Sequence, residues 1–389
     1  MPQIDSKKIS HNRITCSPVN NSTGEERDIT SEFPTAHSRS QLSGESSMGL
    51  RHVARTAKRA ALFSLIATFS TTSMDLHAAD IVDSASARIA TYQTEQGESF
   101  FAVALQPSAD EAILESVRSQ PADIVVIVDT SATQVGEFRS DSIAALESII
   151  GGLRPQDRIS VFAADVTTNP LTSGLVSGTA ATDSVQALSQ RLPLGNTNLM
   201  DAIATAQDTL SDSEKSRTRS IVYVGDGTAV DTMGDQDRFG DMIDGLRRNH
   251  ISMHSVAIGA TRNIELLGIL ANQTGGIIGV VGGDASNDAE ALGSRVADSA
   301  KMSAIWVKEA KLPGGMESVQ ADRLPPLRLD RDSILLGTAT EASQDGQLEI
   351  IGEAAADTIR LTSTVTIEEN HPDFAFLQVS YVTPPGTTA

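Results

Sequence analysis

The chain has little cysteine and a shortage of positive charge. Cys16 is its only cysteine, which excludes a disulfide-stabilised scaffold and a cysteine-based zinc site. Its 30 Lys and Arg residues stand against 50 Asp and Glu residues, a formal net charge of −20. Nucleic acids and anionic membrane surfaces select basic patches, so this charge argues against both as the main partner and is compatible with binding a cation.

Apolar residues are plentiful enough for a folded core. They make up 40% of the 389 residues, which is a globular and not a disordered composition. At ~150 residues per domain, the length suggests one to three domains.

The first eighty residues differ from the rest of the chain. Residues 1–47 are rich in Ser, Thr and charge without an apolar period, which indicates a disordered or untranslated extension. Residues 48–79 run from a basic stretch through the apolar run 60–69 to small residues, the order of a secretory signal peptide. An amphipathic surface helix is the alternative for this segment.

The signal-peptide interpretation places the protein outside the cytoplasm. The apolar run is shorter than the ~20 residues that a membrane-spanning helix needs. We therefore expect an exported protein, periplasmic, cell-surface or extracellular, with no stable transmembrane segment after cleavage.

The middle of the chain, residues 121–300, alternates strand and helix patterns. A continuous apolar run, typical of a strand buried on both faces, occurs at 123–128, and further strands are indicated at 158–163, 221–224, 251–258 and 277–281. Helical spacing occurs at 143–150, 185–192, 199–210, 238–249, 264–273 and 289–300. This alternation predicts an α/β fold: an open, mostly parallel sheet with helices on both faces.

The segments on either side of this domain have a different character. Residues 301–389 alternate apolar and polar positions between turn residues, which predicts a small β-rich unit of antiparallel strands. Residues 80–120 contain an extended segment. We expect it to pair with the β-rich unit, because the two ends of the middle domain must leave it near each other.

Oxygen-bearing side chains follow the predicted strands. The stretch DTSAT (129–133) follows the first strand, GDG (225–227) follows a later one, and GNTN (195–198) opens a helix. In an open parallel sheet, ligands bind at the carboxyl ends of the strands. Two carboxylates and three hydroxyls, without thiol or imidazole, suit Mg²⁺, Mn²⁺ or Ca²⁺. Only two of these donors are acidic, so a metal here would keep positive charge and open positions that can accept a carboxylate from a partner.

Each of these stretches also has a simple structural explanation. Asp129 and Ser131 could cap the next helix, and Thr197 or Asn198 could cap the helix that begins at residue 199. Asp226 could belong to an ordinary turn after a strand. Their joint occurrence at the ends of the expected elements favours a metal site.

The three stretches resemble the von Willebrand factor type A domain over about residues 121–300. The metal-ion-dependent adhesion site of that family combines an Asp-x-Ser-x-Ser loop, a Thr in a second loop and an Asp in a third. The resemblance implies Asp129, Ser131 and Thr197 as direct ligands of the cation, with Thr133 next. It implies Asp226 as a ligand that binds directly or through water.

Two positions depart from the family pattern. Thr133 stands where the family has Ser, and its extra methyl group can crowd the site. Gly225 stands where a Thr often precedes the third-loop Asp, which predicts a looser loop.

The resemblance implies metal-dependent protein binding, in adhesion or assembly, with a partner Asp or Glu completing the metal shell. A metal-free structural scaffold is the alternative. We do not expect an enzyme, because the loop after Val128 has no nucleotide-binding glycine motif and nothing resembles a general base for Ser131. A metal-assisted hydrolase is the weaker alternative.

Overall fold

The computed structural model describes residues 81–107, 111–231, 235–282, 288–318, 324–340, 345–354, 357–366 and 371–381. The predicted extension (1–47) and signal peptide (48–79) lie outside these residues. None of the helices in the described ranges has the length and hydrophobicity of a membrane span.

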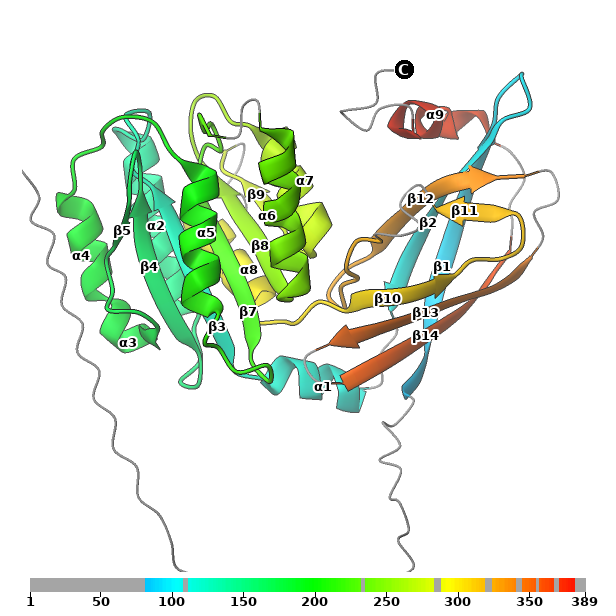
Figure 1. Ribbon diagram of the computed structural model, residues 1–389, viewed down its shortest axis with the longest axis horizontal. Helices are drawn as coiled ribbons and strands as arrows, with labels where there is room; N and C mark the ends of the chain where they lie inside the picture. The colour runs from blue at the N-terminus through cyan, green and yellow to red at the C-terminus, as the bar shows by residue number, and fades with distance from the viewer. Residues whose placement is uncertain are drawn as a thin grey trace, which may run out of the picture. The chain divides into compact units, whose positions relative to one another are not determined.

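A seven-stranded sheet forms the centre of the α/β domain, residues 122–300 (Figure 1). Its strands are β3 (Ala122–Asp129), β4 (Arg158–Ala164), β5 (Thr168–Pro170), β6 (Val176–Ser177), β7 (Thr218–Gly225), β8 (Ile251–Ala257) and β9 (Ile278–Val280). The order is β5-β4-β3-β7-β8-β9, with β6 also paired to β4. The pairs β4–β3, β3–β7, β7–β8 and β8–β9 are parallel. Strands β5 and β6 are both antiparallel to β4.

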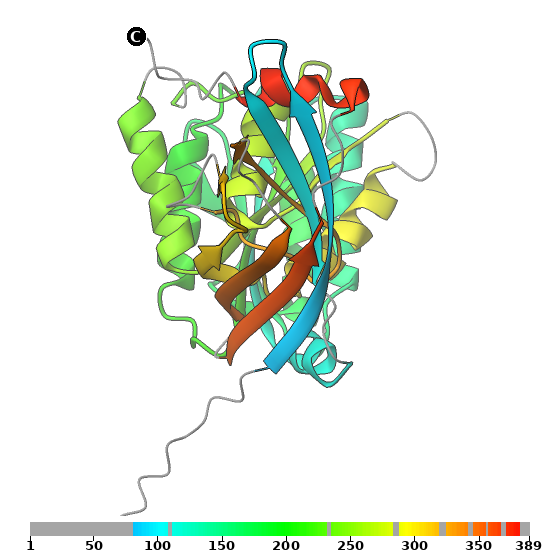
Figure 2. The same cartoon turned by 90° about the vertical axis from the view of Figure 1, so that its right-hand side faces the viewer.

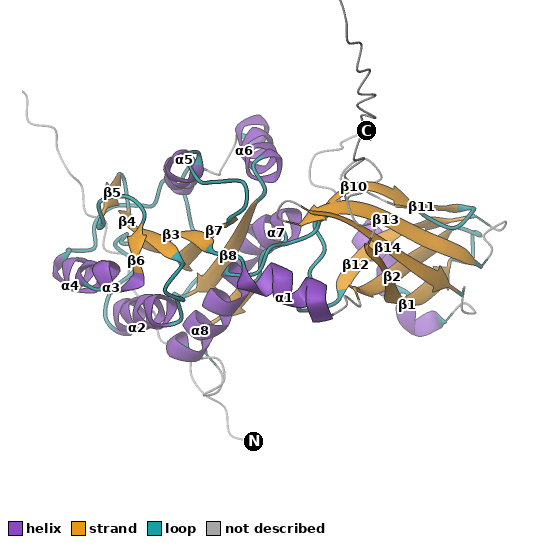
Figure 3. Ribbon diagram, turned by 90° about the horizontal axis from the view of Figure 1, so that it is seen from below, coloured by secondary structure: helices purple, strands orange, loops and turns teal. Residues whose placement is uncertain are grey.

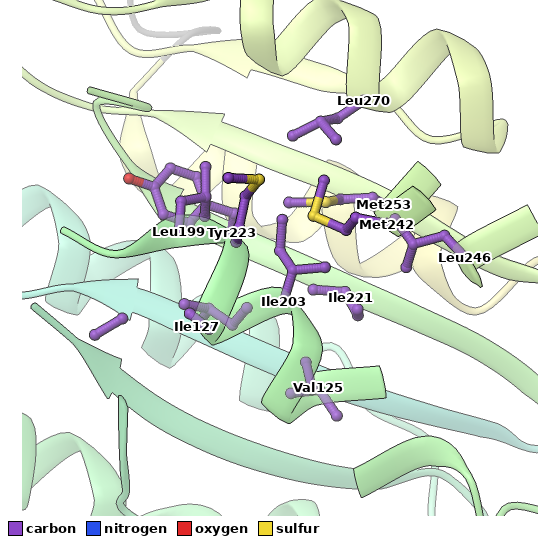
Figure 4. Close-up of a cluster of buried hydrophobic side chains, with 14 of the residues drawn as sticks. Val125, Ile127, Leu199, Ile203, Ile221, Tyr223, Met242, Leu246, Met253 and Leu270 are labelled. Carbon is purple, nitrogen blue, oxygen red and sulfur yellow. The ribbon is translucent and has the colours of Figure 1, made fainter. Parts of the chain in front are cut away.

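Helices cover both faces of this sheet (Figure 3). They are α2 (Glu137–Gly151), α3 (Gly178–Ala181), α4 (Asp183–Gln190), α5 (Leu199–Leu210), α6 (Gln236–Arg248), α7 (Ile264–Thr274) and α8 (Ala289–Ala300). One apolar core lies between the sheet and α5, α6 and α7 (Figure 4), and a second lies under α2, α4 and α8. Because both faces are buried, the central strands are rich in apolar residues. The predicted α/β fold class is confirmed.

The parallel register brings the carboxyl ends of the central strands to one edge. Asp129 is paired with Ala164 across β3 and β4, and Val128 is paired with Val224 across β3 and β7. The loops that follow these strands therefore begin side by side. This edge is where the sequence places the candidate ligands.

Strands from both sides of the α/β domain form a second sheet. They are β1 (Ile81–Gln93), β2 (Ser99–Pro107), β10 (Trp306–Lys311), β11 (Met316–Ser318), β12 (Ser333–Ala339), β13 (Gly346–Ala354) and β14 (Asp357–Val365). The order is β10-β13-β14-β1-β2-β12-β11. In Figure 2 the blue strand β1 lies beside the red-orange strand β14. The expected pairing of the segment before residue 121 with the C-terminal unit is therefore present.

The second sheet differs from the sequence prediction in two respects. The pair β1–β14 is parallel, although the unit was expected to be antiparallel. A parallel pair needs a long crossover connection, and the α/β domain lies between these two strands in the chain. The extended segment also contains a helix, α1 (Glu111–Ser119), which the sequence reasoning missed. Beyond β14 lie a 3₁₀ turn, η2 (Pro372–Phe374), and α9 (Phe376–Tyr381).

Candidate metal centre

The five predicted ligand residues meet at the carboxyl edge of the sheet. Thr197 Oγ1 donates to Asp129 Oδ1 at 2.7 Å, and Thr133 Oγ1 donates to Asp226 Oδ2 at 2.7 Å. The hydroxyl oxygens of Ser131 and Thr133 lie 2.9 Å apart. Hydrogen bonds thus connect donors from three separate loops, and Thr133 takes part despite its extra methyl group.

Each carboxylate is held by the chain that follows it. The Ser131 N–H donates to Asp129 Oδ1 at 2.8 Å, and the Thr228 N–H donates to Asp226 Oδ1 at 2.7 Å. Both contacts are Asx turns, in which an Asp accepts from the backbone two residues later. Local backbone geometry therefore fixes one oxygen of each carboxylate.

The capping alternatives do not describe these residues. Helix α2 begins after Gly136 without a side-chain cap, and Asn198 makes no side-chain cap at the start of α5. Instead, Asp231 caps α5 from the loop after β7, where its carboxylate accepts from three backbone N–H groups. These belong to Leu199, Met200 and Asp201, at 2.9, 2.8 and 3.2 Å.

Asp129 and Asp226 are buried carboxylates without a basic partner. Each is only 2% exposed. Among the residues that the structure describes, neither forms an ion pair with Lys, Arg or His. Burial raises the pKa of Asp129 above its ordinary value, and hydrogen bonds only partly oppose this effect. Nearby Asp165, in contrast, pairs with Arg191 at 2.6 Å.

This donor set fits a divalent cation. Two buried anions without a counterion are costly, and a cation between them would offset that cost. The side-chain donor atoms of the five predicted ligands are all oxygens, which Mg²⁺, Mn²⁺ and Ca²⁺ prefer. No group of three or more His, Cys, Asp or Glu side chains in the described ranges could hold a metal, so binding here would depend on the hydroxyls of Ser131, Thr133 and Thr197 as well as on the two carboxylates.

Two further residues contact the carboxylates and were not selected from the sequence. Tyr223 is fully buried and its hydroxyl donates to Asp129 Oδ2 at 2.8 Å. Figure 4 shows its ring within the apolar core and its hydroxyl oxygen at the margin. The buried Gln134 donates through Nε2 to Asp226 Oδ2 at 3.2 Å. Tyr223 was not selected because it lies within the apolar run of β7, and no sequence pattern marks Gln134 as a contact of the centre.

Gly225 leaves room for the Tyr223 hydroxyl. A Cβ atom at position 225 would lie 2.6 Å from Tyr223 Oη and 2.4 Å from Asp129 Cβ. Residues 223 and 225 share a face of β7, because side chains alternate along a strand. Burial raises the pKa of Tyr223 well above its ordinary value, so the hydroxyl remains a donor. The predicted looseness of this loop is offset by a tyrosine that fills the space beside Gly225.

We expect Tyr223→Phe to fold and to weaken divalent-cation binding. The substitution removes a hydrogen bond that orients Asp129. Loss of a partner that orients a metal ligand typically weakens metal affinity about 10- to 100-fold. The measurement is the Mg²⁺ midpoint, the concentration at which half of the protein holds the cation, fitted from the rise in melting temperature with Mg²⁺ concentration. Tyr92→Phe, on β1 of the second sheet, is the matched control, and equal midpoints for the two variants would refute the role of Tyr223.

Comparisons with known proteins point to one domain family. A model of the von Willebrand factor type A domain matches residues 122–279. A von Willebrand factor type A protein from Catenulispora acidiphila is 12% identical, covers 76% of each chain and has a TM-score of 0.54. The ArnB paralog VWA2 from Sulfolobus acidocaldarius is 18% identical, covers 75% of this chain and 77% of its own, and has a TM-score of 0.46. No curated protein matches the sequence.

At such low identity, the likeness to solved structures shows the fold alone. The match of the family model is independent of that likeness and covers the strands and loops of the candidate metal centre. The chain therefore contains a von Willebrand factor type A domain, within its α/β domain.

Proposed function

We propose that this protein is a divalent-cation-dependent binding module for other proteins, acting in adhesion or assembly. The observation that carries the proposal is the pair of buried carboxylates, Asp129 and Asp226, that face three hydroxyls and have no basic partner in the described residues. A bound Mg²⁺, Mn²⁺ or Ca²⁺ would act as a Lewis acid that accepts one carboxylate from a partner protein.

The side chains of the centre would divide the work of holding the cation. Asp129, Ser131 and Thr197 would be direct ligands, with Thr133 beside them. Asp226 would bind directly or through water. Because only two of the five are acidic, ligand positions remain for an Asp or Glu of the partner.

We also propose that the protein acts after export and is not an enzyme. The signal-peptide pattern at 48–79 supports export to the periplasm, cell surface or exterior. Two histidines of the α/β domain have structural surroundings. His254 accepts the Ile277 N–H at 3.2 Å, and the ring of His250 stacks on Trp306 at a centroid distance of 5.0 Å. These contacts support structural roles for both residues and not the role of a general base for Ser131.

The proposal predicts that Mg²⁺ stabilises the full chain. A ligand at one hundred times its dissociation constant adds about 2.7 kcal/mol to the free energy of unfolding. For a domain of this size, that corresponds to a rise in melting temperature of about 5–10 °C. Thermal unfolding followed by circular dichroism, in a series of Mg²⁺ concentrations and in EDTA, measures the effect.

Three outcomes separate the candidate functions. A rise with Mg²⁺, together with a protein captured from the exported fraction in Mg²⁺ and released by EDTA, supports the adhesion or assembly module. No rise with Mg²⁺, Mn²⁺ or Ca²⁺ supports the metal-free scaffold. A rise with substrate turnover and no stable partner supports the metal-assisted hydrolase.

A further inference from the structure

Exposed apolar side chains gather around the candidate metal centre. Seven of the nine large hydrophobic side chains that are exposed in the described residues lie at the carboxyl edge of the α/β sheet. They are Val135, Val166, Leu192, Leu194, Val230, Ile264 and Val280. The first five lie in the loops after β3, β4 and β7 and before α5, and we call these five the apolar collar.

Backbone hydrogen bonds fix the collar to the loops that carry the metal ligands. The Leu194 N–H donates to the carbonyl oxygen of Thr130, the residue between Asp129 and Ser131, at 3.0 Å. On the other side, the Val230 N–H donates to the carbonyl oxygen of Thr197 at 3.2 Å. Leu194 and Val230 are therefore each bound by a backbone hydrogen bond to a loop that carries predicted metal ligands.

Val166 is held against the same loops. Asn198 Nδ2 donates to the Val166 carbonyl oxygen at 3.0 Å. A Cβ atom at Gly195 would lie 2.5 Å from Val166 Cγ2, so the glycine allows the valine to approach this closely. Three of the five collar residues, Val166, Leu194 and Val230, are thus positioned by contacts with the loops of the centre.

Part of the collar forms the rim of a hollow beside the centre. The hollow is lined by Asp165, Val166, Gln190, Arg191, Leu192 and Leu194. Its two charged residues neutralise each other, because Arg191 Nη2 donates to Asp165 Oδ2 at 2.6 Å. Asp165 is further engaged by the Thr130 hydroxyl at 3.0 Å. The hollow therefore offers apolar surface without a free charge.

Such clustering is unusual for a solvent-exposed surface. Soluble proteins expose large apolar side chains singly, and a contiguous group with a polar site beside it marks an interaction surface. Leu192 is 75% exposed and Leu194 is 64% exposed, although the chain as a whole carries a net charge of −20. Covering these side chains with a partner would remove much apolar area from water.

We propose that the partner presents an Asp or Glu flanked by large aliphatic or aromatic side chains, which pack on the apolar collar while the carboxylate reaches the cation. This inference rests on the proposed function. The pairing of Arg191 with Asp165 supports apolar flanks, since a charged flanking residue would lose hydration in the hollow without gaining a counterion from that pair.

The experiment uses the full chain and a display library of random peptides with a fixed central Asp. Peptides are bound in Mg²⁺ and eluted with EDTA. We expect Leu, Ile, Val, Phe or Met to be enriched next to the Asp in the eluted pool. Eluted peptides with polar, charged or random flanks would overturn the inference. An absence of EDTA-eluted peptides would instead contradict the proposed function.

A double substitution tests whether the collar itself makes the selection. Leu192→Ser with Leu194→Ser should weaken binding of the selected peptides at least about tenfold and leave the Mg²⁺ midpoint unchanged. Ile334→Ser, at a 58% exposed position on β12, is the matched control and should change neither. Unchanged peptide affinity in the double variant overturns the inference. A parallel shift of the Mg²⁺ midpoint also overturns it, because the loop would then position the cation and not the partner.

Discussion

Asp129→Asn is expected to abolish the stabilisation of the protein by Mg²⁺. The substitution keeps the size of the side chain and removes one of the two buried negative charges of the centre. An amide is a much weaker ligand for a hard cation than a carboxylate. At a Mg²⁺ concentration that stabilises the wild type by about 2.7 kcal/mol, the variant should show no rise in melting temperature.

In the absence of metal, Asp129→Asn is expected to leave the stability of the protein unchanged or to increase it. Burial raises the pKa of Asp129, so its ionised form is unfavourable in the folded protein. Replacing it by a neutral amide relieves that cost, and we expect the metal-free variant to be at least as stable as the wild type in EDTA. Loss of the Mg²⁺ effect therefore cannot be attributed to a damaged fold.

Asp157→Asn is the control for Asp129→Asn. Asp157 is also buried, but its carboxylate is bound by Arg154 at 2.8 Å and accepts the Ala122 N–H at 2.9 Å, away from the centre. This variant should lose stability in EDTA and retain the rise with Mg²⁺. If Asp129→Asn retains the rise as well, the cation binds elsewhere and the proposed ligand set is wrong.

Asp123→Ala is expected to cause the largest loss of stability. Asp123 lies at the amino end of β3 and is fully buried. Its carboxylate accepts from Arg158 at 2.6 and 2.8 Å, from Arg217 at 2.8 Å and from the Ser213 hydroxyl at 2.5 Å. Breaking a buried ion pair by removing one partner costs about 3–5 kcal/mol, because the remaining charges lose their counterion. Urea unfolding of the wild type and of Asp123→Ala measures the difference in their free energies of unfolding.

The pH dependence of stability provides a second test of Asp123. Burial alone would raise its pKa, but hydrogen bonds from Arg158, Ser213 and Arg217 lower it below the ordinary value of 3.8. A carboxylate with a lowered pKa in the folded state stabilises the protein above the unfolded pKa, and that contribution is lost as the pH falls through the folded pKa. The difference between wild type and Asp123→Ala should therefore shrink below about pH 4.

Asp123→Ala should leave the Mg²⁺ midpoint unchanged, since the residue lies at the opposite end of β3 from Asp129. A loss of stability below about 1 kcal/mol would show that Arg158 and Arg217 find other partners.

The two ends of strand β3 thus differ in chemistry. The buried carboxylate at the amino end has two arginines, and the one at the carboxyl end has hydroxyl donors.

The fold and the loops of the centre could be predicted because they depend on local patterns. Short segments rich in apolar residues marked the buried strands, and helix α5 was placed at its observed bounds, Leu199–Leu210. The convergence of Asp129, Thr197 and Asp226 followed from the rule that loops at one edge of a parallel sheet meet.

The supporting contacts could not be predicted because they join residues that no pattern relates. Tyr223 lies within an apolar run, and its role depends on the space above Gly225. Asp231 caps α5 although it follows β7 in the chain. Similarly, the parallel pairing of β1 with β14 depends on which distant strand becomes the neighbour of β1. The alternation of apolar and polar residues does not reveal this, because it is the same in parallel and in antiparallel strands.

The pairing of β1 with β14 imposes an order on folding during synthesis. Ile81 pairs with Ile359, so the second sheet stays incomplete until almost the whole chain has left the ribosome. The α/β domain contains its own apolar cores and can fold as soon as α8 is made. Until then β1 and β2 can pair only with each other, with both outer edges open. Closing this sheet across a folded insert requires contacts of large sequence separation, which form slowly. The nascent chain therefore passes through a stage in which the α/β domain is complete and its neighbouring sheet presents open edges to chaperones or to other chains.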